Sequence, residues 1–366
     1  MIDRRLFTNI DWMLVGLVIV ISMLGIVNIY SATTPYKIIG APYYVKQFYW
    51  MAFGMFIALL ICSIDYHILE DFSYWLYFLL VLLLVAVLLV GRRSMGATRW
   101  LHLGFFNIQP SELMKIVIII TFARFFNNFH APGGMTVRDL MFPLGILAVP
   151  ALLIMKQPDL GTATLVVLIA MSMTFYVGLR WTTIVSFILV TIPTCWLAWS
   201  HFLRPYQKNR ILDFLNPERS RLGSGYHIIQ SKIAVGSGGL FGKGFIKGTQ
   251  SQLRFLPEQH TDFAFSVFTE EWGFIGALVL IILYLSLVLW GLNIARRCND
   301  RFGSLLAMGV TAMLFWHIVI NMGMVIGMFP VVGVPMPFFS YGGTSMITSM
   351  VGIGILQNIS MRRFMF

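Results

Sequence analysis

Four carboxylates stand together in the segment 256–274, LPEQHTDFAFSVFTEEWGF, which contains no Lys or Arg. They are Glu258, Asp262, Glu270 and Glu271, in a chain with only 15 acidic residues. Asp262 comes where a polar loop ends and an apolar run begins, so its carboxylate could act as a general base at a water–lipid boundary. The alternative for Asp262 is a helix N-cap, a role that aspartate fills well. We expect Glu258 to be solvated, and Glu270 and Glu271 to make structural hydrogen bonds.

A second polar segment, 91–115, reads GRRSMGATRWLHLGFFNIQPSELMK. Its three arginines, among them Arg99, could donate hydrogen bonds to an anion, and its glycines allow tight turns. Asn107 or Gln109 could cap the helix that follows, and Pro110 suits the first turn of that helix.

Glu112 and Lys115 lie three residues apart at the start of the same helix, so they should share one face. A charged pair one turn into a membrane helix is costly unless it faces a polar cavity. The pair could contact a ligand or form a buried structural ion pair, and these two roles are compatible.

Two further breaks interrupt apolar runs. In 155–165, MKQPDLGTATL, Asp159 either caps a helix or contacts a ligand. In 325–345, VIGMFPVVGVPMPFFSYGGTS, three prolines exclude a regular helix. Irregular backbone at membrane depth is tolerated where it lines a cavity or packs inside protein, and both readings apply to this segment.

The loop 204–263 carries nine basic and four acidic residues, among them Arg204 and Arg210. Its run GSGGLFGKGF resembles a phosphate-binding loop but has Ser237 and Gly244 where that motif needs Gly and Ser or Thr. The glycines could still present backbone N–H groups to an anion, or the run could be a flexible linker. The stretch SGYHIIQSKIAV predicts a short amphipathic helix on the membrane surface.

The elements that must position these segments are membrane helices. The chain is 58% hydrophobic and only 11% charged, with a mean hydropathy of +0.80, which excludes a soluble globule. Three cysteines, two of them inside apolar runs, indicate neither a disulfide framework nor a metal site. Ten apolar runs are long enough to cross a membrane: 11–31, 47–64, 72–90, 112–130, 139–156, 160–178, 183–203, 264–295, 304–323 and 341–360. We therefore expect an all-α polytopic bundle forming a single domain over 1–366, with the loop 204–263 between spans 7 and 8.

The distribution of basic residues gives an orientation. With both termini in the cytoplasm, short inner segments and ends, including Arg4 and Arg5, hold ten basic residues against seven in short outer segments, including Lys37. The positive-inside rule counts short loops, so it favours this arrangement. The segments 91–115, 155–165, 204–263 and 325–345 then all lie on the outer face, which predicts an anionic ligand reached from the outer leaflet, such as a lipid with a phosphate head group.

The same segments carry a resemblance to a known family. QPSE at 109–112, QPDLGT at 157–162, GYHIIQSKIAVGSGGLFGKGF at 225–245, GTQSQLRFLPEQHTDFAFSVFTEE at 248–271 and GVPMPFFSYGGTS at 333–345 resemble the SEDS family of shape, elongation, division and sporulation proteins. The likeness covers nearly the whole chain and is greatest to the elongation members. It implies a ten-helix peptidoglycan glycosyltransferase of the bacterial inner membrane that joins lipid II disaccharides into glycan strands and releases undecaprenyl pyrophosphate.

The resemblance also implies roles for individual residues. It places the essential acid of the family at Asp262 and matches its QPSE glutamate and the following lysine to Glu112 and Lys115. A base near the attacking hydroxyl and positive charge on the leaving pyrophosphate suit the reaction, and a divalent cation, Mg or Mn, could share the second task. The candidate substrate-binding residues are Glu112, Lys115, Arg99, Arg204, Arg210, Asp159, Gln109 and Ser340.

Two other functions fit the same family. A lipid II flippase would need charges deep in the spans, whereas most charges here lie at their outer ends. A scaffold that only recruits the cell-wall synthase would not need Asp262 or Glu112. We expect a class B penicillin-binding protein and membrane proteins of the elongation complex as partners, and no nucleic acid.

Overall fold

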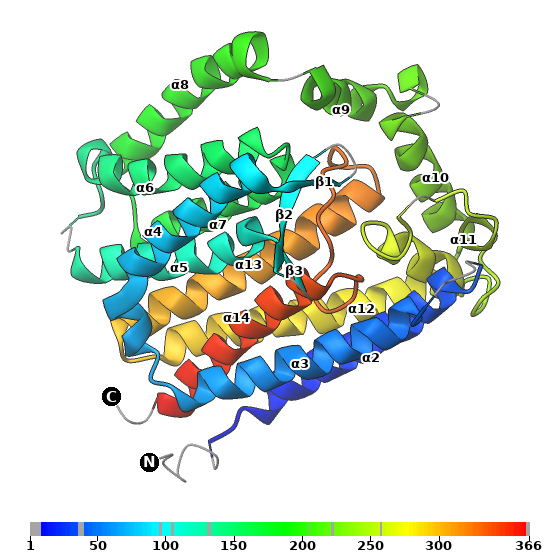
Figure 1. Cartoon of the computed structure of the whole chain (residues 1–366), viewed down its shortest axis with the longest axis horizontal. Coiled ribbons are helices and arrows are strands. Elements are labelled where there is room, and N and C mark those ends of the chain that lie inside the picture. Colours follow the sequence, from blue (N-terminus) through cyan, green and yellow to red (C-terminus); the bar gives the residue numbers. More distant parts are fainter. Residues whose placement is uncertain are drawn as a thin grey trace. The chain divides into compact units, whose positions relative to one another are not determined.

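The computed structural model describes residues 9–35, 40–94, 97–103, 106–129, 133–203, 205–220, 223–256 and 258–363 (Figure 1). Arg4, Arg5, Lys37 and Arg204, which entered the predictions above, lie outside the described residues. The chain groups into two compact units, each built from separate stretches of sequence. Unit 1 comprises Met1–Ser63, Asn209–Gly291 and Leu314–Met361; unit 2 comprises Ile64–Lys208, Leu292–Met313 and Arg362–Phe366.

Unit 1 contains the helices that carry Asp262 and the segment 325–345. Its elements are α2 (Trp12–Thr33), α3 (Tyr43–Ser63), most of α9 (Pro205–Leu215), the 3-10 turn η2 (Pro217–Ser220), α10 (Ser224–Ser237), α11 (Thr249–Gln252), the first part of α12 (Ala264–Arg297), the second part of α13 (Arg301–Val325) and α14 (Gly343–Arg362).

Unit 2 contains the helices that carry Glu112 and Asp159. Its elements are α4 (His67–Val90), α5 (Pro110–Asn128), α6 (Val137–Lys156), α7 (Leu160–Val177), α8 (Trp181–Leu197) with the π-helical turn η1 (Ala198–Phe202), and the adjoining ends of α12 and α13. Three short antiparallel strands, β1 (Arg92–Ser94), β2 (Ala97–Leu103) and β3 (Phe106–Ile108), link α4 to α5. The all-α prediction missed these strands.

Each of the ten expected spans falls on a helix, and eight helices of the described chain are long and apolar enough to cross a membrane. The two spans outside this group are α5 and α14. Both are largely enclosed by protein, since most residues of α5 and of α14 are buried. Polar side chains are tolerated in these helices because they face other helices rather than lipid.

The start of α2 is fixed to two other helices of unit 1 by one carboxylate. Asp11 is the N-cap of α2, where it accepts a hydrogen bond from the Leu14 N–H at 3.3 Å. Its second oxygen accepts hydrogen bonds from Trp290 Nε1 on α12 at 2.8 Å and Ser360 Oγ on α14 at 3.1 Å. The cap therefore also sets how these three helices meet.

Candidate functional site

In unit 2, the Asp159 carboxylate is the centre of a buried polar cluster. Its Oδ2 accepts hydrogen bonds from Gln109 Nε2 at 2.8 Å and Thr162 Oγ1 at 2.9 Å, and the Arg99 Nε lies 4.0 Å away. Arg99 also donates to the Pro158 carbonyl. The structure therefore brings together three predicted site residues, Arg99, Gln109 and Asp159, and adds Thr162, which sequence reasoning missed.

Asp159 is also the N-cap of α7, because its Oδ1 accepts the Thr162 N–H at 3.3 Å. The predicted cap is confirmed. Gln109 occupies the N-cap position of α5, with Pro110 next to it as expected, but its side chain makes no cap bond. The prediction that Gln109 caps α5 was wrong, because its amide is directed to Asp159 instead. The side chain of the other candidate, Asn107, lies outside the described part of the chain.

Glu112 and Lys115 form the ion pair that their spacing predicts, in the first turn and a half of α5. Lys115 Nζ lies 2.8 Å from Glu112 Oε1, and both side chains are buried. The second carboxylate oxygen, Oε2, is buried and has no hydrogen-bond partner among the described residues. Buried polar atoms are normally hydrogen-bonded, so this oxygen is an open acceptor for a donor group of a ligand or water.

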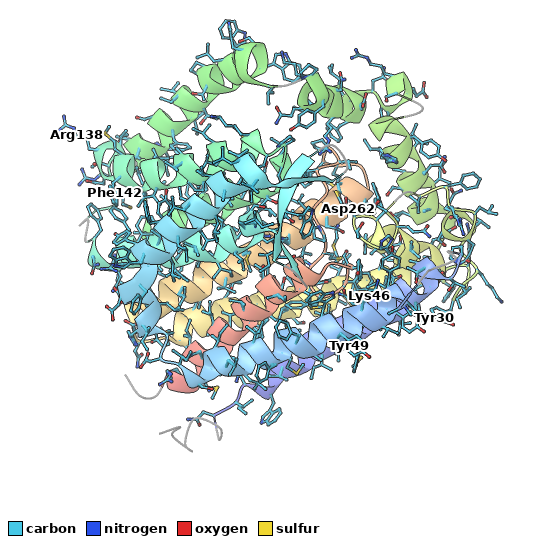
Figure 2. All side chains as sticks on the ribbon, viewed as in Figure 1. Tyr30, Lys46, Tyr49, Arg138, Phe142 and Asp262 are labelled. Carbon is cyan, nitrogen blue, oxygen red and sulfur yellow. The ribbon has the colours of Figure 1, made fainter. Side chains whose placement is uncertain are left out.

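In unit 1, Asp262 lies just before α12 rather than at its cap. The helix begins at Ala264, and the carbonyl of Phe263 accepts the first helical N–H groups, from Ser266 and Val267. By these bonds the N-cap position belongs to Phe263, so Asp262 lies one residue before it. The Asp262 side chain is partly exposed (Figure 2).

Asn321 links the backbone at Asp262 to the irregular segment that precedes α14. Asn321 Nδ2, on α13, donates to the Asp262 carbonyl at 3.0 Å and to the Val334 carbonyl at 2.7 Å. A Cβ atom at Gly333 would lie 3.1 Å from Asp262 Oδ2, so only glycine leaves this approach unobstructed. Asn321 was not predicted, because nothing in the local sequence shows that it spans two distant loops.

An aromatic group two residues before Asp262 was also missed. The His260 ring stacks on Tyr43 at 4.6 Å, and Tyr341 meets Tyr43 edge-on at 4.9 Å. Lys46 Nζ lies 5.6 Å from the centre of the Tyr43 ring, within cation–π range. Burial lowers the pKa of His260 and so favours a neutral ring, whereas the negative charge of Glu258 acts in the opposite direction.

Ser340 is buried and shapes the irregular segment 326–342. Its hydroxyl accepts the Met336 N–H at 3.1 Å, and its carbonyl accepts a hydrogen bond from Gln47 Nε2 at 3.0 Å. The absence of regular helix predicted from the prolines is confirmed here.

Glu270 and Glu271 make the structural hydrogen bonds that we expected. Lys243 Nζ lies 2.7 Å from the buried Glu270 Oε1, which also accepts the Gln250 N–H at 2.9 Å. Ser31 donates its hydroxyl hydrogen to Glu271. These carboxylates hold α2 and the loop 238–252 against α12.

The glycine-rich run packs backbone to backbone on α12, where Gly273 breaks the helix with φ 65°. The N–H groups of Lys243 and Gly244 donate to the carbonyls of Glu270 and Glu271, both at 3.0 Å. Both earlier readings of this run were wrong in this respect: it is not a free linker, and these two N–H groups are used on protein carbonyls rather than presented to an anion.

The remaining predicted features are Arg210, Glu258, an amphipathic helix and the question of a metal site. Arg210 is half-buried on α9, and Glu258 is partly exposed with its carboxylate 3.2 Å from Thr261 Oγ1. The predicted amphipathic helix is α10, which uses Ser231 to bond the Val325 carbonyl at 2.6 Å. Within the described ranges, no group of three or more His, Cys, Asp or Glu side chains could hold a metal ion.

Comparison with known proteins gives consistent matches over nearly the whole chain. The family model for FtsW, RodA and SpoVE, described as "Cell cycle protein", matches residues 10–364. Peptidoglycan glycosyltransferase MrdB of Escherichia coli K12 is 44% identical over 86% of this chain and 85% of its own length. Peptidoglycan glycosyltransferase RodA of Treponema pallidum is 31% identical over 97% of this chain and 98% of its own length.

Solved structures match as well. One described as "Structural coordination of polymerization and crosslinking by a peptidoglycan synthase complex" aligns with a TM-score of 0.84 and 33% identity, covering 98% of this chain and 99% of that one. The rod shape determining protein RodA of Thermus thermophilus aligns with a TM-score of 0.72 and 29% identity, covering 97% and 98%.

Proposed function

The chain belongs to the FtsW/RodA/SpoVE family, and we propose on this basis that it is a peptidoglycan glycosyltransferase that polymerises lipid II. The reaction would join the 4-hydroxyl of one GlcNAc to the anomeric carbon of MurNAc in another disaccharide, with undecaprenyl pyrophosphate as leaving group. The observation that carries the proposal is the 44% identity over 86% of the chain to a peptidoglycan glycosyltransferase.

Asp262 is the proposed general base. Its carboxylate is partly exposed, and its backbone is anchored by Asn321. A carboxylate so placed can take the proton from the attacking hydroxyl while the anomeric carbon inverts. The Tyr43–His260–Tyr341 group, whose histidine precedes Asp262 by two residues, offers flat ring faces for a substrate.

The leaving pyrophosphate needs positive charge. Arg99, Lys115, Arg204 and Arg210 are the proposed donors, and Glu112 would orient Lys115 through their 2.8 Å ion pair. The cluster around Asp159 would hold Arg99 in place from one side, with Gln109 completing the coordination of the carboxylate. Ser340 is a proposed substrate contact through the segment that it shapes.

A divalent cation, Mg or Mn, is a further proposal. The described residues contain no group of three or more His, Cys, Asp or Glu side chains that could hold a metal ion. Mg²⁺ commonly takes one or two carboxylates and completes its shell with phosphate oxygens and water. A cation here would need phosphate oxygens of the substrate as ligands. The proposed stabilisation of the leaving pyrophosphate therefore uses Arg and Lys side chains alone.

The chain is a multi-pass membrane protein with helices related to those of RodA. We place it in the bacterial inner membrane, with both termini in the cytoplasm, the loop 204–263 in the periplasm and the two units acting as one integral membrane domain. A class B penicillin-binding protein is its proposed partner, as suggested by the matched synthase complex, together with membrane proteins of the elongation machinery.

The deciding experiment is polymerisation of purified lipid II by the purified protein, alone and with the penicillin-binding partner. Glycan strands resolved on a gel, formed with release of undecaprenyl pyrophosphate, are the expected result. Translocation of lipid II across vesicles without strand formation would instead establish the flippase. Absence of both activities in a protein that still binds the partner would establish a scaffold.

A further inference from the structure

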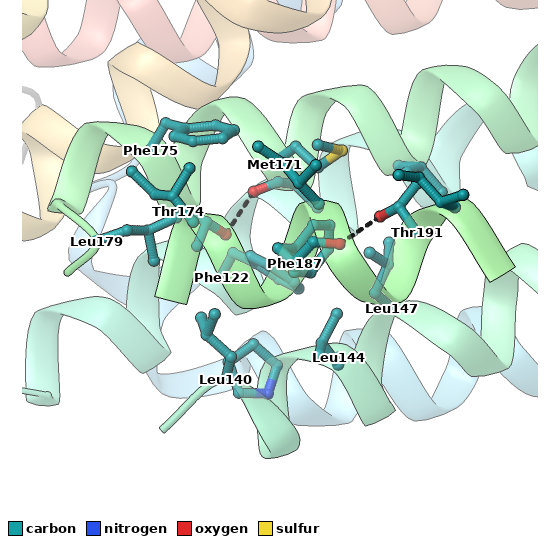
Figure 3. Close-up of a pocket in the computed structure, with 16 residues that line it drawn as sticks. Phe122, Leu140, Leu144, Leu147, Met171, Thr174, Phe175, Leu179, Phe187 and Thr191 are labelled. Carbon is teal, nitrogen blue, oxygen red and sulfur yellow. Dashed lines mark hydrogen bonds between the residues drawn. The ribbon is translucent and has the colours of Figure 1, made fainter. Parts of the chain in front are cut away.

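Within unit 2, α6, α7 and α8 surround an apolar cavity of about 600 Å³ (Figure 3). This is within the range of roughly 300–1,000 Å³ found for ligand pockets. Among the described residues, the only polar lining side chains are Thr174 and Thr191, and their hydroxyls donate to the carbonyls of Ala170 and Phe187 on their own helices, both at 2.7 Å. The cavity therefore offers no polar recognition and suits a purely apolar occupant.

The start of α8 is fixed to the segment before α6. The Thr183 hydroxyl donates to the Met135 carbonyl at 2.9 Å, and the Arg180 N–H donates to the same carbonyl at 3.3 Å. Among the residues of α8 whose side chains the structure describes, only Thr183 is buried. Beyond this anchor, α8 turns one face, including Ile184 and Ile188, toward a space that no side chain fills.

The anchored end of the cavity carries positive charge. Arg180 is exposed and follows Leu179, a lining residue; its Nε donates to the Gly134 carbonyl at 3.1 Å. Arg138 is exposed on the first turn of α6, at the same end (Figure 2). The neighbouring Asp139 is engaged in a capping box with Thr136, so the two guanidinium groups outnumber the one carboxylate.

We propose that this cavity binds one acyl chain of an anionic glycerophospholipid, with the phosphate of the lipid against Arg180 and Arg138. An empty space at membrane depth forfeits the dispersion contacts of its walls, and a lipid chain restores them. Chain contacts do not distinguish one phospholipid from another, whereas basic residues at the membrane surface attract anionic head groups. None of the lining residues belongs to the candidate catalytic set, so the lipid serves to hold α8 in place rather than to react.

A photoactivatable phosphatidylglycerol with a diazirine in its acyl chain tests this site. The purified protein is reconstituted in phosphatidylcholine vesicles containing the probe, irradiated and digested, and the labelled peptides are identified by mass spectrometry. Labelling should fall on the cavity-facing residues of α6, α7 and α8. Unlabelled phosphatidylglycerol should compete better than phosphatidylcholine by at least about fivefold, the effect expected from about 1 kcal/mol for a single basic residue.

Two matched pairs of variants separate chain from head group. Ile188→Trp fills the cavity, whereas Leu189→Trp places the same ring on the exposed side of α8. Only the first should lower labelling; Leu144→Trp, from α6, repeats this test if Ile188→Trp does not fold. Arg180→Gln combined with Arg138→Gln should abolish the preference for phosphatidylglycerol and keep the chain labelling, whereas Arg296→Gln combined with Arg297→Gln, at two exposed arginines on α12, should change neither.

Three outcomes would overturn the proposal. One is labelling that Ile188→Trp and Leu144→Trp leave unchanged, which would mean general contact with bilayer lipid. Another is equal competition by the two phospholipids. The third is crosslinking, in native membranes, of the cavity residues to another protein, which would make the occupant a partner helix.

Discussion

The ammonium group of Lys115 lies 2.8 Å from the Glu112 carboxylate, and the two side chains are only 1% and 7% exposed. Each charge is therefore kept from water, and the two charges compensate each other. Removing one partner of a buried pair leaves an uncompensated charge, which is worse than removing both.

Glu112→Ala and Lys115→Ala should each lower the free energy of unfolding by about 3–5 kcal/mol, and the double variant should lose clearly less than the sum. Unfolding of the purified protein in detergent measures all three. The Asp65–Arg362 pair is the control: its carboxylate is 37% exposed and 3.7 Å from the guanidinium, so its coupling should stay below about 1 kcal/mol. Strict additivity at Glu112 and Lys115 would show that they do not stabilise each other.

The glycine-rich run predicts a second stability effect. Gly242 has φ 78°, and a Cβ atom there would lie 2.1 Å from the Glu271 carbonyl oxygen. Gly242→Ala should therefore separate the loop from the break in α12 and cost about 3 kcal/mol or more. Gly236→Ala is the matched control six residues earlier: it lies within α10 with nothing within 4 Å, so alanine should be neutral or stabilising there. Equal melting temperatures for the two variants would contradict the close packing.

Spacing along one helix predicted the Glu112–Lys115 pair correctly, because helical geometry is local and places residues three apart on one face. The membrane spans and the break before α14 followed from apolar length and proline for the same reason. Contacts between distant segments were not accessible in this way. Asn321 reaches back 59 residues to the Asp262 carbonyl, and Gly242 meets α12 near Gly273 through backbone atoms that carry no sequence signature.

The candidate site was predictable only where a residue could be read from its own neighbourhood. Asp159 is a cap, as its position before LGT suggested, but its bond to Gln109 joins residues 50 positions apart. Asp262 was located correctly as a loop-to-helix residue, yet its place one residue before the N-cap followed only from the first helical hydrogen bonds, which begin at Phe263.

Stability should fall as the pH is lowered below about 6.5, the value at which an exposed histidine titrates. Burial lowers the pKa of His227 on α10, and its Nδ1 is buried without a hydrogen-bond partner among the described residues. The unfolded chain then binds a proton that the folded protein does not, so acid favours unfolding, and the effect is absent well above pH 6.5.

His227→Gln should flatten the pH dependence of the melting temperature between about pH 5 and 7. Burial acts in the same direction on His260, so part of the slope should remain. His201→Gln, at an exposed histidine on η1, is the control and should leave the slope as it is. If the melting temperature of His227→Gln depended on pH as steeply as that of the wild type, or more steeply, His227 would not be the source of the acid sensitivity.

Single cysteines should show which loops face the periplasm. In a background with Cys62, Cys195 and Cys298 replaced by serine, Ser220→Cys and Ser94→Cys should react in intact cells with a membrane-impermeant thiol reagent. Arg138→Cys should react only after the cells are permeabilised, because the inner segments hold more of the short-loop basic residues. Labelling of Arg138→Cys alone in intact cells would reverse the orientation and place the candidate site on the wrong side for lipid II.

Asp262→Asn should abolish polymerisation of lipid II while the protein still folds, inserts and binds the substrate. Asparagine keeps the size of the side chain and its capacity to accept a hydrogen bond, but it has no negative charge and cannot take up a proton from a hydroxyl. Loss of activity of at least about 10²-fold is expected for a general base.

Glu258→Gln is the matched control, since this carboxylate is four residues away and partly exposed. It should retain most of the activity. Thermal unfolding and retention of fluorescent lipid II in detergent would establish that Asp262→Asn is folded and binds. Strand formation at close to the wild-type rate in Asp262→Asn would remove Asp262 as the base. Equal loss in both variants would instead indicate that the negative charge of this loop matters, wherever it is placed, and not proton transfer at Asp262.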